Sequence, residues 1–161
     1  MIRGYFPLVW MNHSRLLNNR INSLHERELR LVHRDFVSSF SELLEKDNSV
    51  TIHQRNLQCL VYEIFKAQHS LSPEIMSEIF KFKDTQYNLR NNMRLQGRNV
   101  KTVSYGNESV SALAPKLWRL LPPEIKNIES PSEFKQKIKT FKIENCPCRL
   151  CKVYIKDIGF I

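Results

Sequence analysis

The chain has 161 residues, of which 42% are hydrophobic and 25% are charged, a balance typical of a folded globular domain rather than a disordered segment. This length suits one ordinary domain and excludes a multi-lobed enzyme. The net charge of +9 is unevenly placed, because residues 1–80 hold nine Lys/Arg against nine Asp/Glu whereas residues 81–161 hold sixteen against seven. Such a basic half favours a polyanionic partner, nucleic acid before an anionic membrane, and the alternative is a solvated basic face without a ligand.

Residues 1–12 place six large apolar side chains in the seven positions from Tyr5 to Met11. We expect this segment either to pack into the core or to dock on another polypeptide, because exposed apolar patches of that size are rare. It lacks the long apolar region and cleavage site of a signal peptide, and no run is long enough to span a bilayer. We therefore expect a cytoplasmic or nuclear protein that is not secreted and does not contact a membrane.

Helical signals recur along the chain. Ser39 with Glu42, and Thr51 with Gln54, match the capping box that opens a helix. Apolar residues from Leu57 to Phe65 follow the helical period and predict one continuous buried stripe. The predicted helices are 15–34, 40–46, 52–69, a short one after Ser72, 112–121 and 131–142.

Three of these helices carry more detailed expectations. In the first, Leu17, Ile21, Leu24, Leu31 and Val32 fall near the helical period with arginines elsewhere on the surface. In the short helix we expect Ser72 as the cap, Pro73 as the first helical residue, and inward-facing side chains at Ile75, Met76, Ile79 and Phe80. Ser111 is the expected cap of the helix over 112–121.

Residues 81–110 differ in composition, since basic and amide side chains dominate and Val100 to Tyr105 is rich in β-branched residues. The sequence thus predicts a mainly α, single-domain helical fragment with a small extended or β element near residues 87–110. We divide it into a helical region, 1–80, and a basic region, 81–161, within one structural unit. Tyr87 and Tyr105 suit either stacking on nucleic-acid bases or anchoring of a loop. The candidate phosphate-binding residues are Lys81, Lys83, Arg90, Arg94, Arg98, Lys101, Lys135 and Lys139.

The sharpest local motif is the run from Cys146 to Cys151, which reads C-P-C-R-L-C. Cys148 and Cys151 have the C-x-x-C spacing that lets two thiolates hold one Zn²⁺, and Cys146 is close enough to be a third ligand. The fourth ligand would come from Cys59, His53, His69 or His33. A redox-active pair and a turn that binds nothing are the two alternatives.

Motifs of catalysis are missing from the sequence. Its four glycines are dispersed, no nucleophile elbow occurs, and no two aspartates are close enough to hold a catalytic metal pair. We therefore expect no catalytic residue, no small-molecule substrate and no enzymatic activity in this chain alone.

Several phrases in order along the chain resemble the C-terminal part of a LINE-type, non-LTR retrotransposon reverse transcriptase of the jockey-like kind. They read PLVWMNHSRLLNNRINSLHERELRLVHRDF, FSELLEKDNSVTIHQRNLQCLVYEIFKAQHSLSPEIM, YNLRNN, SYGNESVSALAPKLWRLLPPEIKN, SEFKQKIKTF and CPCRLCKVYIKDIGFI. The resemblance covers nearly the whole chain.

The resemblance implies that this segment follows the catalytic palm of an RNA-directed DNA polymerase and helps hold the template and the nascent duplex. The palm carboxylates lie upstream in that family, so no catalytic residue carries over. Its implied partners are RNA or DNA and the upstream polymerase portion of the same element. Some LINE-type enzymes have a Cys-Cys-His-Cys zinc knuckle near the C-terminus, and the spacing of Cys146, Cys148 and Cys151 departs from that pattern.

Overall fold

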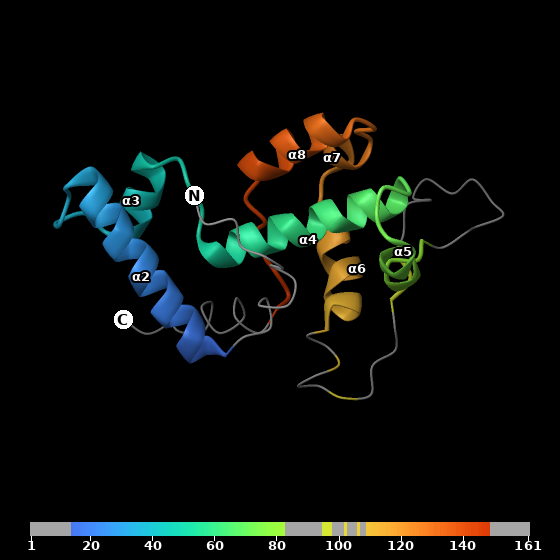
Figure 1. The fold of residues 1–161 in the computed structure, drawn as a ribbon, viewed down its shortest axis with the longest axis horizontal. Coiled ribbons are helices and arrows are strands. Elements are labelled where there is room, and N and C mark those ends of the chain that lie inside the picture. The colour runs from blue at the N-terminus through green and yellow to red at the C-terminus, as the bar shows by residue number, and fades with distance from the viewer. Residues whose placement is uncertain (1–13, 83–94, 98–101, 103–105, 107–108, 149–161) are drawn as a thin grey trace. The chain divides into compact units, whose positions relative to one another are not determined.

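A computed structural model describes residues 14–82, 95–97, 102, 106 and 109–148 of the chain. This part contains seven helices, labelled α2 to α8 in Figure 1, and so confirms the mainly α class. Its one β feature is an isolated antiparallel bridge between Phe82 and Leu95, and most of the element expected near 87–110 falls outside the described residues. Within the described ranges, no helix combines the length and apolar character needed to cross a membrane.

The chain forms two compact units, Met1–Asn56 and Leu57–Ile161. The division falls inside α4 (Ile52–Gln68), which is one continuous helix. The first turn of α4 is therefore carried by the same helical backbone as the rest of it.

The first unit contains α2 (Arg15–His33) and α3 (Phe40–Lys46). Ser14 caps α2 by accepting a hydrogen bond from the Leu17 N–H, and Arg34 ends it in the left-handed region at φ 50°. At α3 the expected capping box is confirmed, because Ser39 accepts from the Glu42 N–H at 3.4 Å and the Glu42 carboxylate accepts from the Ser39 N–H at 2.7 Å.

The buried side of α2 differs from the apolar face that the sequence pattern indicates. Asn18 and Leu29 are the buried residues, whereas Leu17, Leu24 and most of the other periodic apolar residues are exposed. The physical reason is the short partner: α3 has only seven residues, and it contacts α2 on the side of His25, whose ring lies 5.7 Å from that of Phe40.

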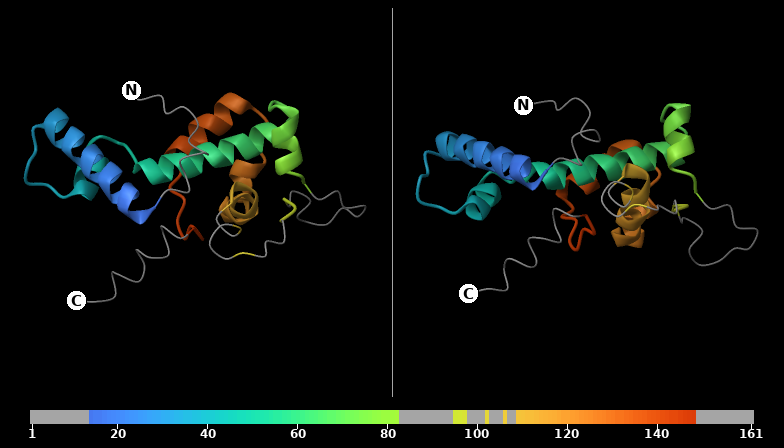
Figure 2. Two further views of the ribbon diagram at one scale, coloured as in Figure 1. Left: turned by 60° about the horizontal axis from the view of Figure 1, so that its bottom comes forward. Right: turned by 90° about the horizontal axis from the view of Figure 1, so that it is seen from below.

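The second unit is built on α4, and here the predicted stripe is confirmed. Its five apolar members are fully buried: Leu57, Leu60, Val61, Ile64 and Phe65. They follow the i, i+3, i+4, i+7, i+8 pattern, which makes a stripe wide enough to pack against more than one helix. Figures 1 and 2 show α8 (Pro131–Thr140) running beside α4 and α6 (Val110–Leu120) crossing it.

An aromatic cluster joins these helices. The ring of Phe134 on α8 stacks on Phe65 of α4 at 4.1 Å and lies 6.4 Å from Trp118 of α6. Phe82, one of the two residues of the β bridge, meets Trp118 edge to face at 6.0 Å. Because aromatic side chains bury large apolar areas, this cluster is the centre of the hydrophobic core.

Two helix starts in this unit correct the expectations. α5 (Glu74–Ile79) begins after Pro73, which is its N-cap, so Ser72 is not the cap. α6 is capped by Ser109, because its hydroxyl rather than that of Ser111 accepts from the Ala112 N–H. α7 (Pro123–Lys126) and α8 both begin with proline.

The inward side of α5 is also corrected in part. Ile75 is 65% exposed and Ile79 is 36% exposed, whereas Phe80 is buried as expected. Met76 is half-buried. The six-residue helix thus meets the core only at its C-terminal end, where Phe80 is the C-cap.

Candidate metal centre and basic surface

His53 lies in the first turn of α4 and is buried. The helix starts there because the Thr51 hydroxyl accepts a hydrogen bond from the Gln54 N–H at 3.2 Å, which is one half of the expected capping box. The imidazole of His53 is therefore attached to the N-terminal turn of α4, which is helical backbone rather than a loop.

Cys146 and Cys148 lie in the segment that follows α8. This segment is held along α4 by Gln58, whose buried amide donates hydrogen bonds to the carbonyls of Lys139 and Phe141 at 3.2 and 3.0 Å. Asn145 then turns the chain in the left-handed region at φ 54°, a conformation that asparagine tolerates better than most residues. Cys146 is buried and Cys148 is half-buried.

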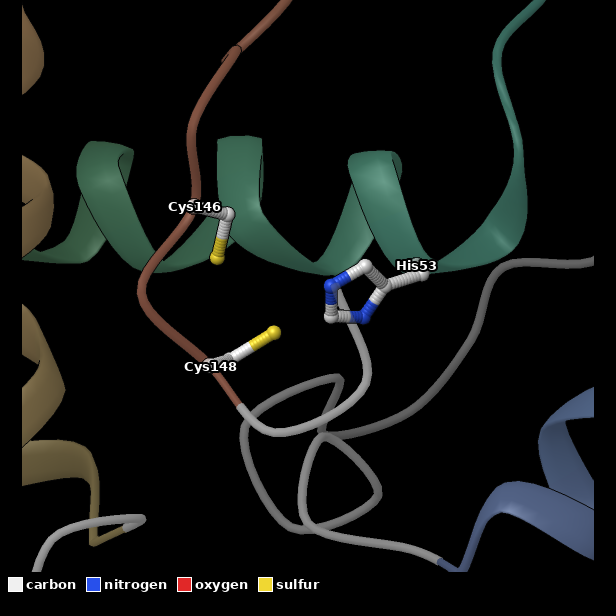
Figure 3. Close-up of side chains that lie close together, drawn as sticks. All are labelled: His53, Cys146 and Cys148. Atoms are coloured by element: carbon white, nitrogen blue, oxygen red, sulfur yellow. The ribbon is translucent and has the colours of Figure 1, made fainter. Parts of the chain in front are cut away.

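One imidazole nitrogen of His53 and the two thiol sulfurs lie within 4.8 Å of one another. Figure 3 shows the three side chains, one from α4 and two from the segment after α8, converging on a common point. In a tetrahedral zinc site with bonds of about 2.0–2.3 Å, neighbouring ligand atoms are about 3.5–3.8 Å apart. Small side-chain rotations would therefore close these three atoms around an ion.

The structure selects among the ligands that the sequence left open. His53 joins the cysteines, whereas His33 pairs with Asp47 at 3.2 Å and His69 lies with its ring 4.3 Å from that of Phe65. Cys59 is not in the group, and Cys151 lies outside the described residues. Residues that are close enough to bind a metal ion are thus His53, Cys146 and Cys148.

A sequence signal for the paired thiols did exist in C-P-C. Proline favours an extended conformation at the residue before it, and in extended chain the side chains at i and i+2 point to the same side. Cys146 and Cys148 have that spacing. No comparable local signal separates His53 from the other histidines, because its partners are far away in sequence.

The candidate phosphate-binding residues are only partly within the described chain. Lys81, Lys135 and Lys139 are described, and all three are exposed. The remaining five candidates and the two tyrosines of this region lie outside the described residues: Lys83, Arg90, Arg94, Arg98, Lys101, Tyr87 and Tyr105.

The lysines of α8 surround its buried side. Phe134 and Ile138 point into the core, and Lys135 and Lys139 lie one turn apart on an exposed face. Two like charges at i and i+4 destabilise a helix by roughly 0.2–0.5 kcal/mol, and an anion bound between them relieves this repulsion. The ion pairs found in the described residues all join groups between Glu26 and Lys66, and none reaches a lysine of α8.

Further cations of the second unit are not among the candidates selected from the sequence. The Lys135 ammonium lies 5.8 Å from the centre of the Tyr62 ring, and the Lys66 ammonium lies 5.4 Å from it. Lys116 and Arg119 are exposed on α6. Burial lowers the pKa of Lys126, whose ammonium is 3.5 Å from the Arg119 carbonyl.

Comparison of the chain with protein-family models, with curated proteins and with solved structures finds no match.

Proposed function

We propose that the chain is a non-catalytic, nucleic-acid-contacting segment of a LINE-type reverse transcriptase, and that the basic residues of its second half bind the phosphate backbone. The observation that carries the nucleic-acid proposal is the exposed lysine pair of α8, Lys135 and Lys139, neither of which forms an ion pair with a carboxylate of the described residues. A polyanion would relieve the repulsion within this pair. The assignment to a reverse transcriptase rests on the phrases of sequence that resemble that family.

Salt dependence of binding tests the proposal. The full chain is titrated into labelled single-stranded RNA and into an RNA–DNA duplex at several salt concentrations. Each phosphate contact on a duplex contributes about 0.9 to the slope of log affinity against log salt. The double variant Lys135→Gln/Lys139→Gln should therefore lower that slope by roughly 1.8.

Lys46→Gln is the control: it removes one positive charge, against two in the double variant, from a lysine that is already paired with Asp35. We expect it to leave the slope nearly unchanged. Absence of binding at low salt would reject nucleic-acid contact, and an equal effect of the control would reject a specific role for α8. Primer extension by the purified chain would reject the non-catalytic assignment.

We also propose that His53, Cys146 and Cys148 hold a Zn²⁺ ion, with Cys151 as the fourth ligand. Thiolates together with an imidazole form a soft donor set that suits zinc, and hard cations such as Mg²⁺ prefer oxygen. Cys151 follows Cys148 at the C-x-x-C spacing of zinc ligands. The ion would fasten the segment after α8 to the first turn of α4, which is a structural role.

Metal analysis of the full chain, purified under reducing conditions, tests this assignment. One zinc per chain is expected in the wild type, with a large loss in Cys148→Ser and in His53→Gln. Cys59→Ser is the matched control, since Cys59 is outside the metal-ligating group. Co²⁺ substitution should give thiolate-to-cobalt absorption that weakens in Cys146→Ser. Metal-free wild type with an unchanged unfolding midpoint would reject zinc, and a disulfide in that protein would favour the redox alternative.

A further inference from the structure

α2 has an uncovered row of leucines. Leu17, Leu24 and Leu31 are spaced seven residues apart, and their exposed fractions are 39%, 64% and 69%. Seven residues fall about 20° short of two full helical turns, so the three side chains form a nearly straight row along the helix. Soluble proteins seldom leave a continuous apolar row of this length exposed without a partner.

The row points away from the side of α2 that is packed within its own unit. That packed side holds Asn18 and Leu29, which are buried, and His25, which meets Phe40 of α3. At 100° per residue, the packed side is centred roughly 120° around the helix from the row. α3 therefore does not cover the row.

Charge runs along one edge of the row. Arg20 and Arg27 each follow a leucine of the row by three residues, and both are exposed. No carboxylate in the described residues forms an ion pair with either arginine. Glu28 is also exposed and lies between Leu24 and Leu31, so it interrupts the row with one negative charge.

These charges argue against a second copy of the chain as the occupant. In an antiparallel pair of α2 helices, like edges meet, so the arginine edges would repel. In a parallel pair, the arginine edge would meet the edge that carries Asn18, which is buried, and His25, which already contacts Phe40 of α3. The chain's own residues 1–13 are also poorly matched, since they contain an arginine and no carboxylate.

We propose that α2 is a docking site for an amphipathic helix of another polypeptide with apolar residues at heptad spacing and acidic residues along one edge. The apolar residues would cover Leu17, Leu24 and Leu31, and the acidic edge would pair with Arg20 and Arg27. A basic residue of the partner would lie opposite Glu28. This docking does not depend on nucleic-acid binding or on zinc.

Two synthetic helical peptides probe the site on the full chain. Both carry leucine at the a and d heptad positions, and one carries glutamate at e and g where the other carries lysine. We expect the glutamate peptide to bind about tenfold more tightly than the lysine peptide in a fluorescence anisotropy titration. Arg20→Glu/Arg27→Glu should reverse that order, and Leu24→Gln should weaken binding of both peptides.

Leu120→Gln is the matched control, because Leu120 is exposed on α6 to a similar degree as Leu17. Since all substituted residues are exposed, each variant should keep the thermal midpoint of the wild type. Equal binding of the two peptides, or none, would overturn the proposal. A wild-type dimer that Leu24→Gln dissociates would also overturn it, because the row would then be covered by a second copy of the chain. A Leu24→Cys thiol that reacts as slowly as a buried thiol would overturn it too, because the row would then be covered by the chain itself.

Discussion

α2 and α4 have similar lengths, 19 and 17 residues, and both carry regularly spaced apolar side chains, yet their environments are opposite. The α4 stripe from Leu57 to Phe65 is fully buried, whereas the leucine row of α2 is exposed. The α4 stripe covers two adjacent positions on successive turns; Phe134 of α8 stacks on its Phe65, and Trp118 of α6 stacks in turn on Phe134. The α2 row is one residue wide, and the helix that packs on α2, the seven-residue α3, meets it on another side. A helical period thus identifies a helix but does not establish that its apolar side is buried.

The largest difference between the two regions should appear on truncation of an apolar side chain. Phe134→Ala removes the centre of the aromatic cluster and should lower the free energy of unfolding by about 3–5 kcal/mol. Leu24→Ala, on the exposed row, should change it by no more than about 0.5 kcal/mol. Urea unfolding followed by circular dichroism measures both, and similar losses would mean that the α2 row is buried in solution.

A buried polar contact should give a smaller effect. Gln58→Ala removes the two hydrogen bonds that hold the carbonyls of Lys139 and Phe141, and should cost about 1–3 kcal/mol. Hydrogen exchange near the end of α8 should accelerate, because that segment loses its attachment to α4. Gln136→Ala, at an exposed position of α8, is the control and should leave both measurements unchanged.

Removal of an N-cap hydroxyl should also have different effects on the stability of a helix in the first unit and of a helix in the second. Ser39→Ala removes the capping box of α3 and should cost about 0.5–2 kcal/mol of local stability. Ser130→Ala should cost less, because Ser130 is the N-cap of α8 but its hydroxyl accepts no hydrogen bond from the helix backbone. Hydrogen exchange of each helix distinguishes the two, and equal effects would contradict the capping geometry.

The smallest expected effect is a dependence on acidic pH in the first unit. The Lys46 ammonium, followed by the Ser38 backbone, holds the pKa of Asp35 below its usual 3.8, and the Ser39 backbone N–H lowers the pKa of Glu42 below 4.5. Carboxylates with a lowered pKa in the folded state stabilise it above their unfolded pKa and lose that effect as the pH falls further. Exchange in α3 should therefore rise below about pH 4.

Asp35→Asn provides the control for this dependence. With the carboxylate removed, the acid-induced rise in exchange should become smaller, because one of the two groups no longer titrates. An identical pH profile in the variant would show that Asp35 does not contribute.

Local signals predicted the described helices well where the side chains that specify them are close in sequence. The box at Ser39 and Glu42 set the start of α3, and proline set the start of α8. The same signals failed at α5, where Ile75 and Ile79 have the correct spacing but no neighbouring surface to pack against. For the candidate metal centre, the sequence predicted Cys146, Cys148 and Cys151 as ligands and left His53 as one of four alternatives for the fourth ligand; the structure brings Cys146, Cys148 and His53 together, and Cys151 lies outside the described residues.

By itself, the sequence determined the helical class, most of the helix boundaries and the placement of the positive charge, and it named Cys146 and Cys148 among the candidate ligands, because these depend on neighbours within a few residues. Only the tertiary structure decided that α4 is covered and α2 is not, and that His53 rather than His33 or His69 meets the cysteines. These choices depend on which distant segments pack together. Packing follows the shapes and areas of whole helix faces, and the spacing of residues along one helix does not contain that information.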